Sequence, residues 1–169
     1  MQTTWAYISN YSIYSAMAVF ALSFLAHAFE TAWAVRSPEL IDSAVQEFLR
    51  YLTPIPWMGR TTVPETGATD LPDDRYVNIS FVSGNFDPEI FPDPTTINLR
   101  RERNSHVAFG FGPHTCIGNH LAEFEVRVFL QVLLSSNINW SISPDTAIMR
   151  YPDELSSVPL VIEKLYISL

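Results

Sequence analysis

The sequence is poor in lysine and cysteine, and each shortage excludes a class of protein. Lys164 is the only lysine and Cys116 the only cysteine among 169 residues, and the formal net charge is −8. Nucleic-acid binding normally needs a basic face, so we expect no nucleic-acid partner. A lone cysteine cannot form an internal disulfide. The absence of paired cysteines suits a reducing compartment, and we expect a cytoplasmic protein.

Common catalytic motifs are missing as well. The chain has no Walker A loop, no Rossmann glycine fingerprint and no His-Glu-x-x-His motif. Three histidines, His106, His114 and His120, lie near Cys116 in the sequence, so a Cys/His zinc site and a Cys/His nucleophile pair are alternatives. The spacing matches no standard zinc pattern, and no oxyanion motif accompanies the cysteine.

Charged residues are absent from positions 1–29. The strongly apolar run over 16–25 is shorter than the roughly 20 residues of a membrane span. Ala26-His27-Ala28 resembles a signal-peptidase site, yet no basic region precedes it. We favour a buried core helix over a signal or membrane anchor.

The next segment has the pattern of an amphipathic helix. Ser37 and Pro38 form a start signal, and apolar residues then recur at helical spacing as far as Leu52. Glu47 and Arg50 are three residues apart and therefore neighbours on this helix. Taken alone, that pair is an ordinary surface ion pair.

The remaining elements indicate a mainly α protein with small antiparallel β elements (α+β). Strands are predicted over 61–63 and 76–82, followed by an irregular stretch over 85–94 with three prolines. A helix face follows the cysteine, and a closing antiparallel pair is predicted from 138–142 and 158–162. The predicted helix face consists of Ile117, Leu121, Phe124, Val128 and Val132. The arginines at 100, 101 and 103 are predicted to lie in a solvated loop, with an acidic partner as the alternative.

The most informative stretch is the loop from Phe109 to Gly118, which has the spacing Phe-x-x-Gly-x-x-x-Cys-x-Gly around Cys116. Glycines adopt positive φ without a Cβ clash and let the backbone approach a flat ligand. A cysteine just before a helix start can be stabilised as a thiolate by nearby amides. A cysteine in such a place can serve as a metal ligand or as a nucleophile. The alternative is a buried cysteine that packs as a small hydrophobe.

This loop resembles the haem-thiolate loop of the cytochromes P450. Glu47-x-x-Arg50, followed by Pro54, Pro56 and Arg60, is similar to a second signature of that family. The resemblance runs from about residue 36 to the C-terminus and more faintly back to residue 8. It implies a truncated P450-like fold, because family members are normally more than twice this long. Residues 1–169 would then form one haem-binding domain, with a distal-helix-like segment over 1–35.

The resemblance also implies roles for individual residues. Cys116 is the axial iron ligand of haem b, the iron protoporphyrin IX. His114 and Arg60 hold the haem propionates, the latter with a planar, permanently charged fork. The residues Phe109, Gly110, Gly112 and Gly118 shape the loop around the sulfur, Glu47 and Arg50 brace the core beneath the haem, and Ser12 touches the distal ligand.

Three features depart from the family pattern. Tyr11 and Ser12 stand where the family has an acid and a threonine, and tyrosine is a poor substitute for a carboxylate. Thr96 stands where a third arginine completes a triad with Glu47 and Arg50, and Arg100 or Arg101 is the available replacement. The hairpin after Arg60 is about two residues short.

Two functions therefore stay open. One is a haem-thiolate monooxygenase that acts on a small apolar substrate and takes electrons from a ferredoxin or reductase. The other is a non-catalytic haem-binding or split-protein module, completed by a homo-oligomer or a complementing chain. Its motivation is the apolar surface that truncation would expose.

Overall fold

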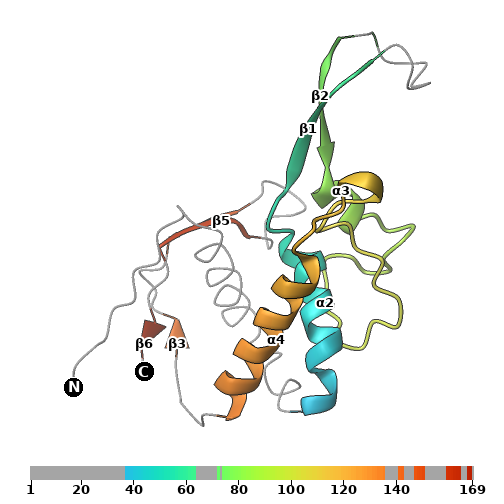
Figure 1. Ribbon diagram of the computed structural model, residues 1–169. Coiled ribbons are helices and arrows are strands. Elements are labelled where there is room, and N and C mark those ends of the chain that lie inside the picture. The colour runs from blue at the N-terminus through green and yellow to red at the C-terminus, as the bar shows by residue number, and fades with distance from the viewer. Residues whose placement is uncertain are drawn as a thin grey trace.

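The chain is described from a computed structural model, which places residues 37–63, 72, 74–135, 141–142, 147–150, 159–164 and 167–168. Two helices lie side by side, a β-hairpin projects from them, and two further pairs of short strands lie beyond (Figure 1). All three strand pairs are antiparallel. The predicted α+β class is confirmed.

The first helical segment begins with a 3₁₀ turn, η1 (Pro38–Leu40), and continues as α2 (Ile41–Leu52). Ser37 occupies the N-cap position, although its side chain makes no capping hydrogen bond. The helix ends at Thr53, which has a left-handed backbone with φ of +38° and donates its hydroxyl to the Arg50 carbonyl at 2.7 Å. Most of α2 is buried, and its apolar side chains form the centre of the core.

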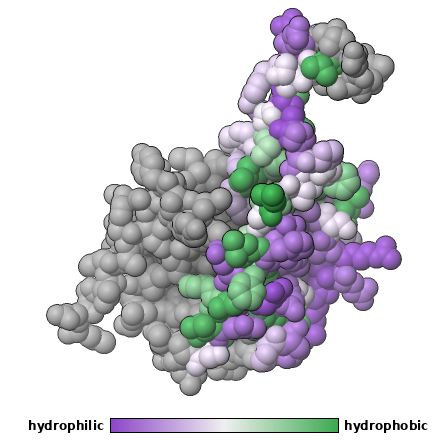
Figure 2. Space-filling view, in the orientation of Figure 1, coloured by the Kyte–Doolittle hydropathy of each residue, from purple (hydrophilic) through white to green (hydrophobic). Residues whose placement is uncertain are grey.

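The second long helix, α4 (Asn119–Ser135), packs against α2. Val126 and Leu130 face the core and are almost fully buried. Side chains at Leu121, Phe124 and Val132 are more than half exposed. The apolar face predicted over 121–132 is therefore a real face of the helix, but it is directed away from the core (Figure 2). Ile117, predicted as its first residue, lies in the turn before α4 begins.

The hairpin differs from the prediction at both of its strands. β1 (Trp57–Thr61) begins four residues before the predicted strand at 61–63. β2 (Tyr76–Ser80) ends at Ser80, whose hydroxyl accepts the Ser83 amide and caps the short helix α3 (Phe81–Asn85). The antiparallel register pairs Trp57 with Ser80. The predicted strand over 76–82 is thus two residues too long.

The C-terminal strands form two pairs rather than the one that was predicted. β3 (Ser141–Ile142) pairs with β6 (Ile167–Ser168), and β4 (Ala147–Arg150) pairs with β5 (Pro159–Lys164). The prediction that 138–142 pairs with 158–162 is wrong, because residues 159–164 take the unpredicted strand β4 as their partner. Residues 138, 140 and 158 lie outside the described part.

Turns fill most of the stretch from α3 to α4, in agreement with its prolines. This stretch includes the short 3₁₀ helix η3 (Gly112–His114), which ends two residues before the cysteine. No helix within the described ranges is both long enough and apolar enough to cross a membrane. The apolar segment over 1–29 lies outside those ranges.

Candidate functional site

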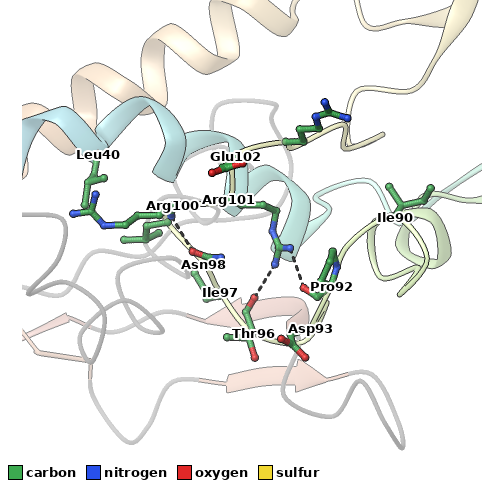
Figure 3. A pocket seen from close by; sticks show the side chains of 12 residues that line it. Leu40, Ile90, Pro92, Asp93, Thr96, Ile97, Asn98, Arg100, Arg101 and Glu102 are labelled. Atoms are coloured by element: carbon green, nitrogen blue, oxygen red, sulfur yellow. Dashed lines mark hydrogen bonds between the residues drawn. The ribbon is translucent and has the colours of Figure 1, made fainter.

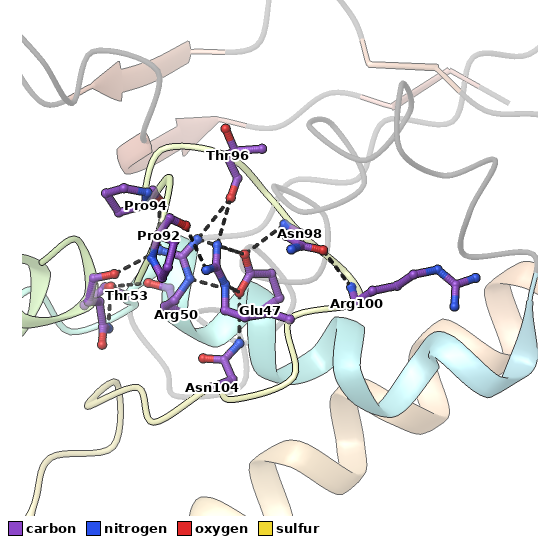
Figure 4. A network of polar contacts seen from close by, with 11 residues as sticks. Glu47, Arg50, Thr53, Pro92, Pro94, Thr96, Asn98, Arg100 and Asn104 are labelled. Carbon is purple, nitrogen blue, oxygen red and sulfur yellow. Dashed lines mark hydrogen bonds and ion pairs between the residues drawn. The ribbon is translucent and has the colours of Figure 1, made fainter. Parts of the chain in front are cut away.

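Glu47 and Arg50 form a fully buried ion pair on α2, not a surface pair. Both side chains have no exposed area, and the two groups meet through two hydrogen bonds of 2.8 and 2.9 Å. The other side of the guanidinium donates to the backbone carbonyls of Asn85 and Pro94. Arg50 therefore joins α2 to the irregular segment that follows α3 (Figure 4).

A second arginine, Arg101, meets the same carboxylate. Its Nε lies 3.0 Å from Glu47 Oε2 and its Nη2 lies 3.3 Å from Oε1, a two-point contact of the planar fork. Its side chain is only 8% exposed. The expectation that this arginine lies in a solvated loop is therefore wrong, and Arg101 takes the place left open beside Glu47 and Arg50. Thr96 contributes its backbone carbonyl, which accepts from both arginines.

Two asparagines complete the surroundings of the carboxylate. The Asn98 amide donates to Oε1 and the Asn104 side chain donates to Oε2, each at 2.9 Å. Burial raises the pKa of Glu47, but the hydrogen bonds from Arg50, Asn98 and Arg101 outweigh it, and the net pKa lies below its ordinary value. Glu47 is thus a stable anion that holds three parts of the chain together.

An open hollow of about 750 Å³ lies beside this network (Figure 3). Leu40 and the segment 90–103 line it, and Arg101 borders it with hydrogen bonds to the carbonyls of Pro92 and Thr96. No residue of the Cys116 loop lines this hollow. Its position therefore separates it from the residues that the sequence nominates for cofactor binding.

The Cys116 loop closes on itself through backbone hydrogen bonds. The Cys116 amide donates to the Phe109 carbonyl at 2.9 Å, and the Thr115 amide donates to the Gly112 carbonyl at 3.0 Å. Gly110 and Gly112 have φ of +74° and +69°, so two of the glycines adopt the positive φ that we predict. A Cβ at Gly118 would lie 3.9 Å from the sulfur. The loop thus brings Phe109, Gly118 and the cysteine close together.

The side chains at the tip of this loop are open to solvent. Cys116 is an exposed free thiol, and Phe111 and Ile117 are 87% and 103% exposed. The alternative of a buried structural cysteine is therefore wrong. Helix α4 begins three residues after the sulfur, so its N-terminal amides lie near a group that can become an anion. An accessible thiol in such a place is suited to ligation.

The other nominated residues are placed separately. Arg60 is the next-to-last residue of β1, is partly exposed, and donates to the Gly59 carbonyl at 2.8 Å. His114 is an exposed residue of η3. Within the described residues, no hydrogen bond or ion pair joins either side chain to the cysteine. Ser12 and Tyr11 lie outside the described part.

The donor set decides which metal groups fit this site. Nowhere in the described ranges do three His, Cys, Asp or Glu side chains converge, so these residues provide no Cys/His zinc site. Cys116 supplies a single soft ligand. A single protein thiolate fits a metal that a macrocycle would already hold, as in haem-thiolate proteins. The positive-φ glycines and the exposed thiol fit such a flat group.

Little in the sequence could have revealed the network around Glu47 beyond its two helix residues. Arg101, Asn98 and Asn104 are more than 50 positions away from Glu47. Their position depends on the path of the turns over 86–104, which carry no periodic signal. The cluster of arginines was visible, but it did not show which one turns inward.

Comparisons with known proteins point to one family. The family model for Cytochrome P450 matches residues 34–168. A steroid C26-monooxygenase of Mycolicibacterium smegmatis is 35% identical over 127 residues, which are 74% of this chain and 32% of that protein. The polyketide biosynthesis cytochrome P450 PksS of Bacillus subtilis is 31% identical over 151 residues, covering 85% of this chain and 37% of PksS.

Solved structures show the same likeness. The structure of P450 OxyD, which is involved in the biosynthesis of vancomycin-type antibiotics, superposes with a TM-score of 0.73 at 28% identity. That superposition covers 91% of this chain and 39% of OxyD. The chain thus spans about one third of the curated relatives it matches.

Proposed function

The chain belongs to the cytochrome P450 family, and on that premise we propose that it binds haem b through Cys116 and serves as a haem-thiolate monooxygenase. The observation that carries the proposal is the free, exposed Cys116 thiol in a positive-φ glycine loop at the start of α4. Haem bound in this way supplies oxygen activation, and the thiolate's electron donation favours O–O cleavage.

Each part of the chain has a distinct task in this proposal. Loop amides and the N-terminus of α4 stabilise the anionic sulfur. Arg60 and His114 hold the propionates, because guanidinium and imidazole N–H groups both donate hydrogen bonds to carboxylates. In the haem-bound protein, Phe109 is proposed to help shield the sulfur from water. The buried network of Glu47, Arg50 and Arg101 fixes α2 and the segment that leads into the loop.

The substrate class that we propose is a small apolar organic molecule, with electrons from a ferredoxin or a reductase. The names of the steroid and polyketide relatives support an apolar substrate. Ser12 is proposed to donate a hydrogen bond near the distal ligand.

The first experiment is optical. The full chain is reconstituted with haem, reduced and exposed to carbon monoxide, and the Soret band is expected at the position typical of thiolate ligation. Cys116→Ser is expected to lose that band, whereas the control His120→Asn keeps it, since His120 is an exposed residue on the first turn of α4. Absence of haem uptake, or a spectrum that Cys116→Ser leaves unchanged, would overturn the proposal.

A second candidate function is a haem-binding or interaction module without catalysis. The observation in its favour is the exposed apolar face of α4, formed by Leu121, Phe124, Val128 and Val132 (Figure 2). Turnover of apolar substrates with peroxide separates the two functions. Product formation that depends on Cys116 supports the monooxygenase, and a thiolate spectrum without turnover supports the module.

A further inference from the structure

Two side chains tie the segment that enters the Cys116 loop to consecutive residues of α2. Asn104 donates to Glu47, and His106 Nε2 lies 3.0 Å from Gln46 Oε1. The first contact belongs to the buried network described above. The second contact lies outside that network and involves a titratable group that the proposed function does not use.

The hydrogen bonds of His106 define which form of the ring is present. The Ala108 amide lies 3.3 Å from Nδ1, and a backbone N–H can only donate, so Nδ1 must accept. The proton of the neutral ring is then on Nε2, where it donates to Gln46 Oε1. If Nδ1 carried a second proton, its N–H would face the Ala108 N–H. Two donors cannot form a hydrogen bond with each other, so the bond from Ala108 would be lost.

The charges around the ring act in opposite directions. Burial lowers the pKa of His106 below its ordinary value of 6.5. Glu123 of α4, a hydrogen bond to the backbone of His106 itself and Glu47 of α2 favour the charged ring, and Arg50 opposes it. The net direction agrees with the neutral form that the hydrogen bonds require.

The ring of His106 also contacts the loop itself. Its centroid lies 6.1 Å from that of Phe109, with the planes inclined at 55°. The carbonyl of Phe109 accepts the amide of Cys116 at 2.9 Å, and the amide of Gly110 donates to the Val107 carbonyl. Only one residue, Phe109, thus separates the His106 ring from the backbone of the cysteine.

From these contacts we propose that His106 is a positioning residue whose neutral Nε2–H form couples α2 to the Cys116 loop, and that protonation of the ring releases this coupling. The inference rests on the proposed function, because the loop is of chemical interest as the carrier of the thiolate. The contacts themselves belong to the polypeptide, so they are testable without haem.

The test measures the alkylation rate of Cys116 by iodoacetamide in the full chain without haem, from pH 8 to pH 5. Cys116 is the only thiol, so the reagent reports on this loop alone. Each rate constant is divided by that of His106→Asn at the same pH, which cancels the ionisation of the thiol itself. Asn at this position can still accept the amide two residues on, but it does not titrate.

The expected result is a ratio that falls by about threefold to tenfold on acidification, the factor that one net hydrogen bond contributes. Cys116 is already exposed, and a loosened loop stabilises the reactive thiolate less well. Gln46→Glu places a carboxylate beside Nε2 and should move that fall to higher pH. The control His120→Asn should leave the fall unchanged. A flat wild-type ratio, or a fall whose midpoint Gln46→Glu does not move, overturns the inference.

Haem-loaded protein then separates this inference from the proposed function. If haem binds through Cys116, the thiolate fraction of the spectrum should fall over the same pH range in the wild type and not in His106→Asn. A pH-dependent alkylation ratio without haem uptake would retain the coupling and reject the proposed function. Thiolate-ligated haem with a flat alkylation ratio would retain the proposed function and reject the coupling.

Discussion

The Glu47 network is buried, whereas the side chains at the tip of the Cys116 loop are exposed to solvent. Glu47 and Arg50 have no exposed area, and the carboxylate receives hydrogen bonds from four other residues. Cys116 and Phe111 stand open to solvent, and the loop's own backbone bonds hold it in shape. We therefore expect substitutions in the network to change the free energy of unfolding, and substitutions in the loop to change the proposed chemistry.

The largest loss in the free energy of unfolding is expected from a substitution at Glu47. We expect Glu47→Gln to lower the free energy of unfolding by about 3–5 kcal/mol, because a buried guanidinium loses its counter-charge. Urea denaturation followed by far-UV circular dichroism measures this loss. The control is Glu39→Gln, at an exposed position in η1. Equal effects of the two substitutions would show that the network does not carry the stability.

Acid should weaken the network without any substitution. The pKa of Glu47 in the folded chain lies below its ordinary value of 4.5, so its contribution to stability is present above that pH and is lost as the pH falls through the folded value. We expect the urea midpoint of the wild type to fall more steeply below pH 4.5 than that of Glu47→Gln. Parallel profiles would contradict a lowered pKa. The folded pKa of His106 is also lowered, from 6.5, so its contribution to stability is lost in the same direction. That loss begins at a higher pH, as the pH falls below 6.5.

The next effect in size concerns the second arginine. We expect Arg101→Gln to cost about 1.5–3 kcal/mol, since it removes charge-assisted hydrogen bonds to a buried carboxylate. Arg100→Gln is the matched control on an exposed neighbour and should change stability by less than about 0.5 kcal/mol. A reversed order would return the role to Arg100, the other replacement that the sequence leaves open.

These two arginines show how far the sequence can be interpreted. The helix at 37–52 and the loop at 109–118 are local patterns, so periodicity and glycine spacing locate them well. The choice between Arg100 and Arg101 is not local, because it depends on how the turns over 86–104 bring a carboxylate 54 residues away within reach. Irregular turns have no regular alternation of buried and exposed side chains, so the sequence does not predict which arginine points inward.

Helix α4 and the strands show a different limit. Apolar residues lie on both faces of α4, so periodicity finds a face but does not show whether it packs on α2. β1 begins at Trp57, close behind Pro54 and Pro56, and the turn signal of the prolines hides that start. β5 pairs with β4 and not with the segment over 138–142. Residue composition predicts that each segment is a strand, but it does not determine which strands pair.

Within the loop, we expect a moderate effect at Gly112. Its φ is +69° and nothing lies within 4 Å of a Cβ placed there, so Gly112→Ala introduces backbone strain alone. The expected loss is about 1–2 kcal/mol. Gly118→Ala is the control, because its added methyl group would meet the sulfur at an ordinary contact distance of 3.9 Å. Similar losses at both positions would mean that packing, not φ, shapes the loop.

The smallest effect on stability is expected where the proposed chemistry is greatest. Cys116→Ser changes one atom of an exposed side chain, so the free energy of unfolding of the chain without haem should change by less than about 0.5 kcal/mol. The same urea experiment as for Glu47 measures it. The substitution should at the same time abolish alkylation by iodoacetamide and the thiolate-type spectrum after haem reconstitution. A large loss of stability would show that the sulfur supports the fold, and the separation between the network and the loop would then fail.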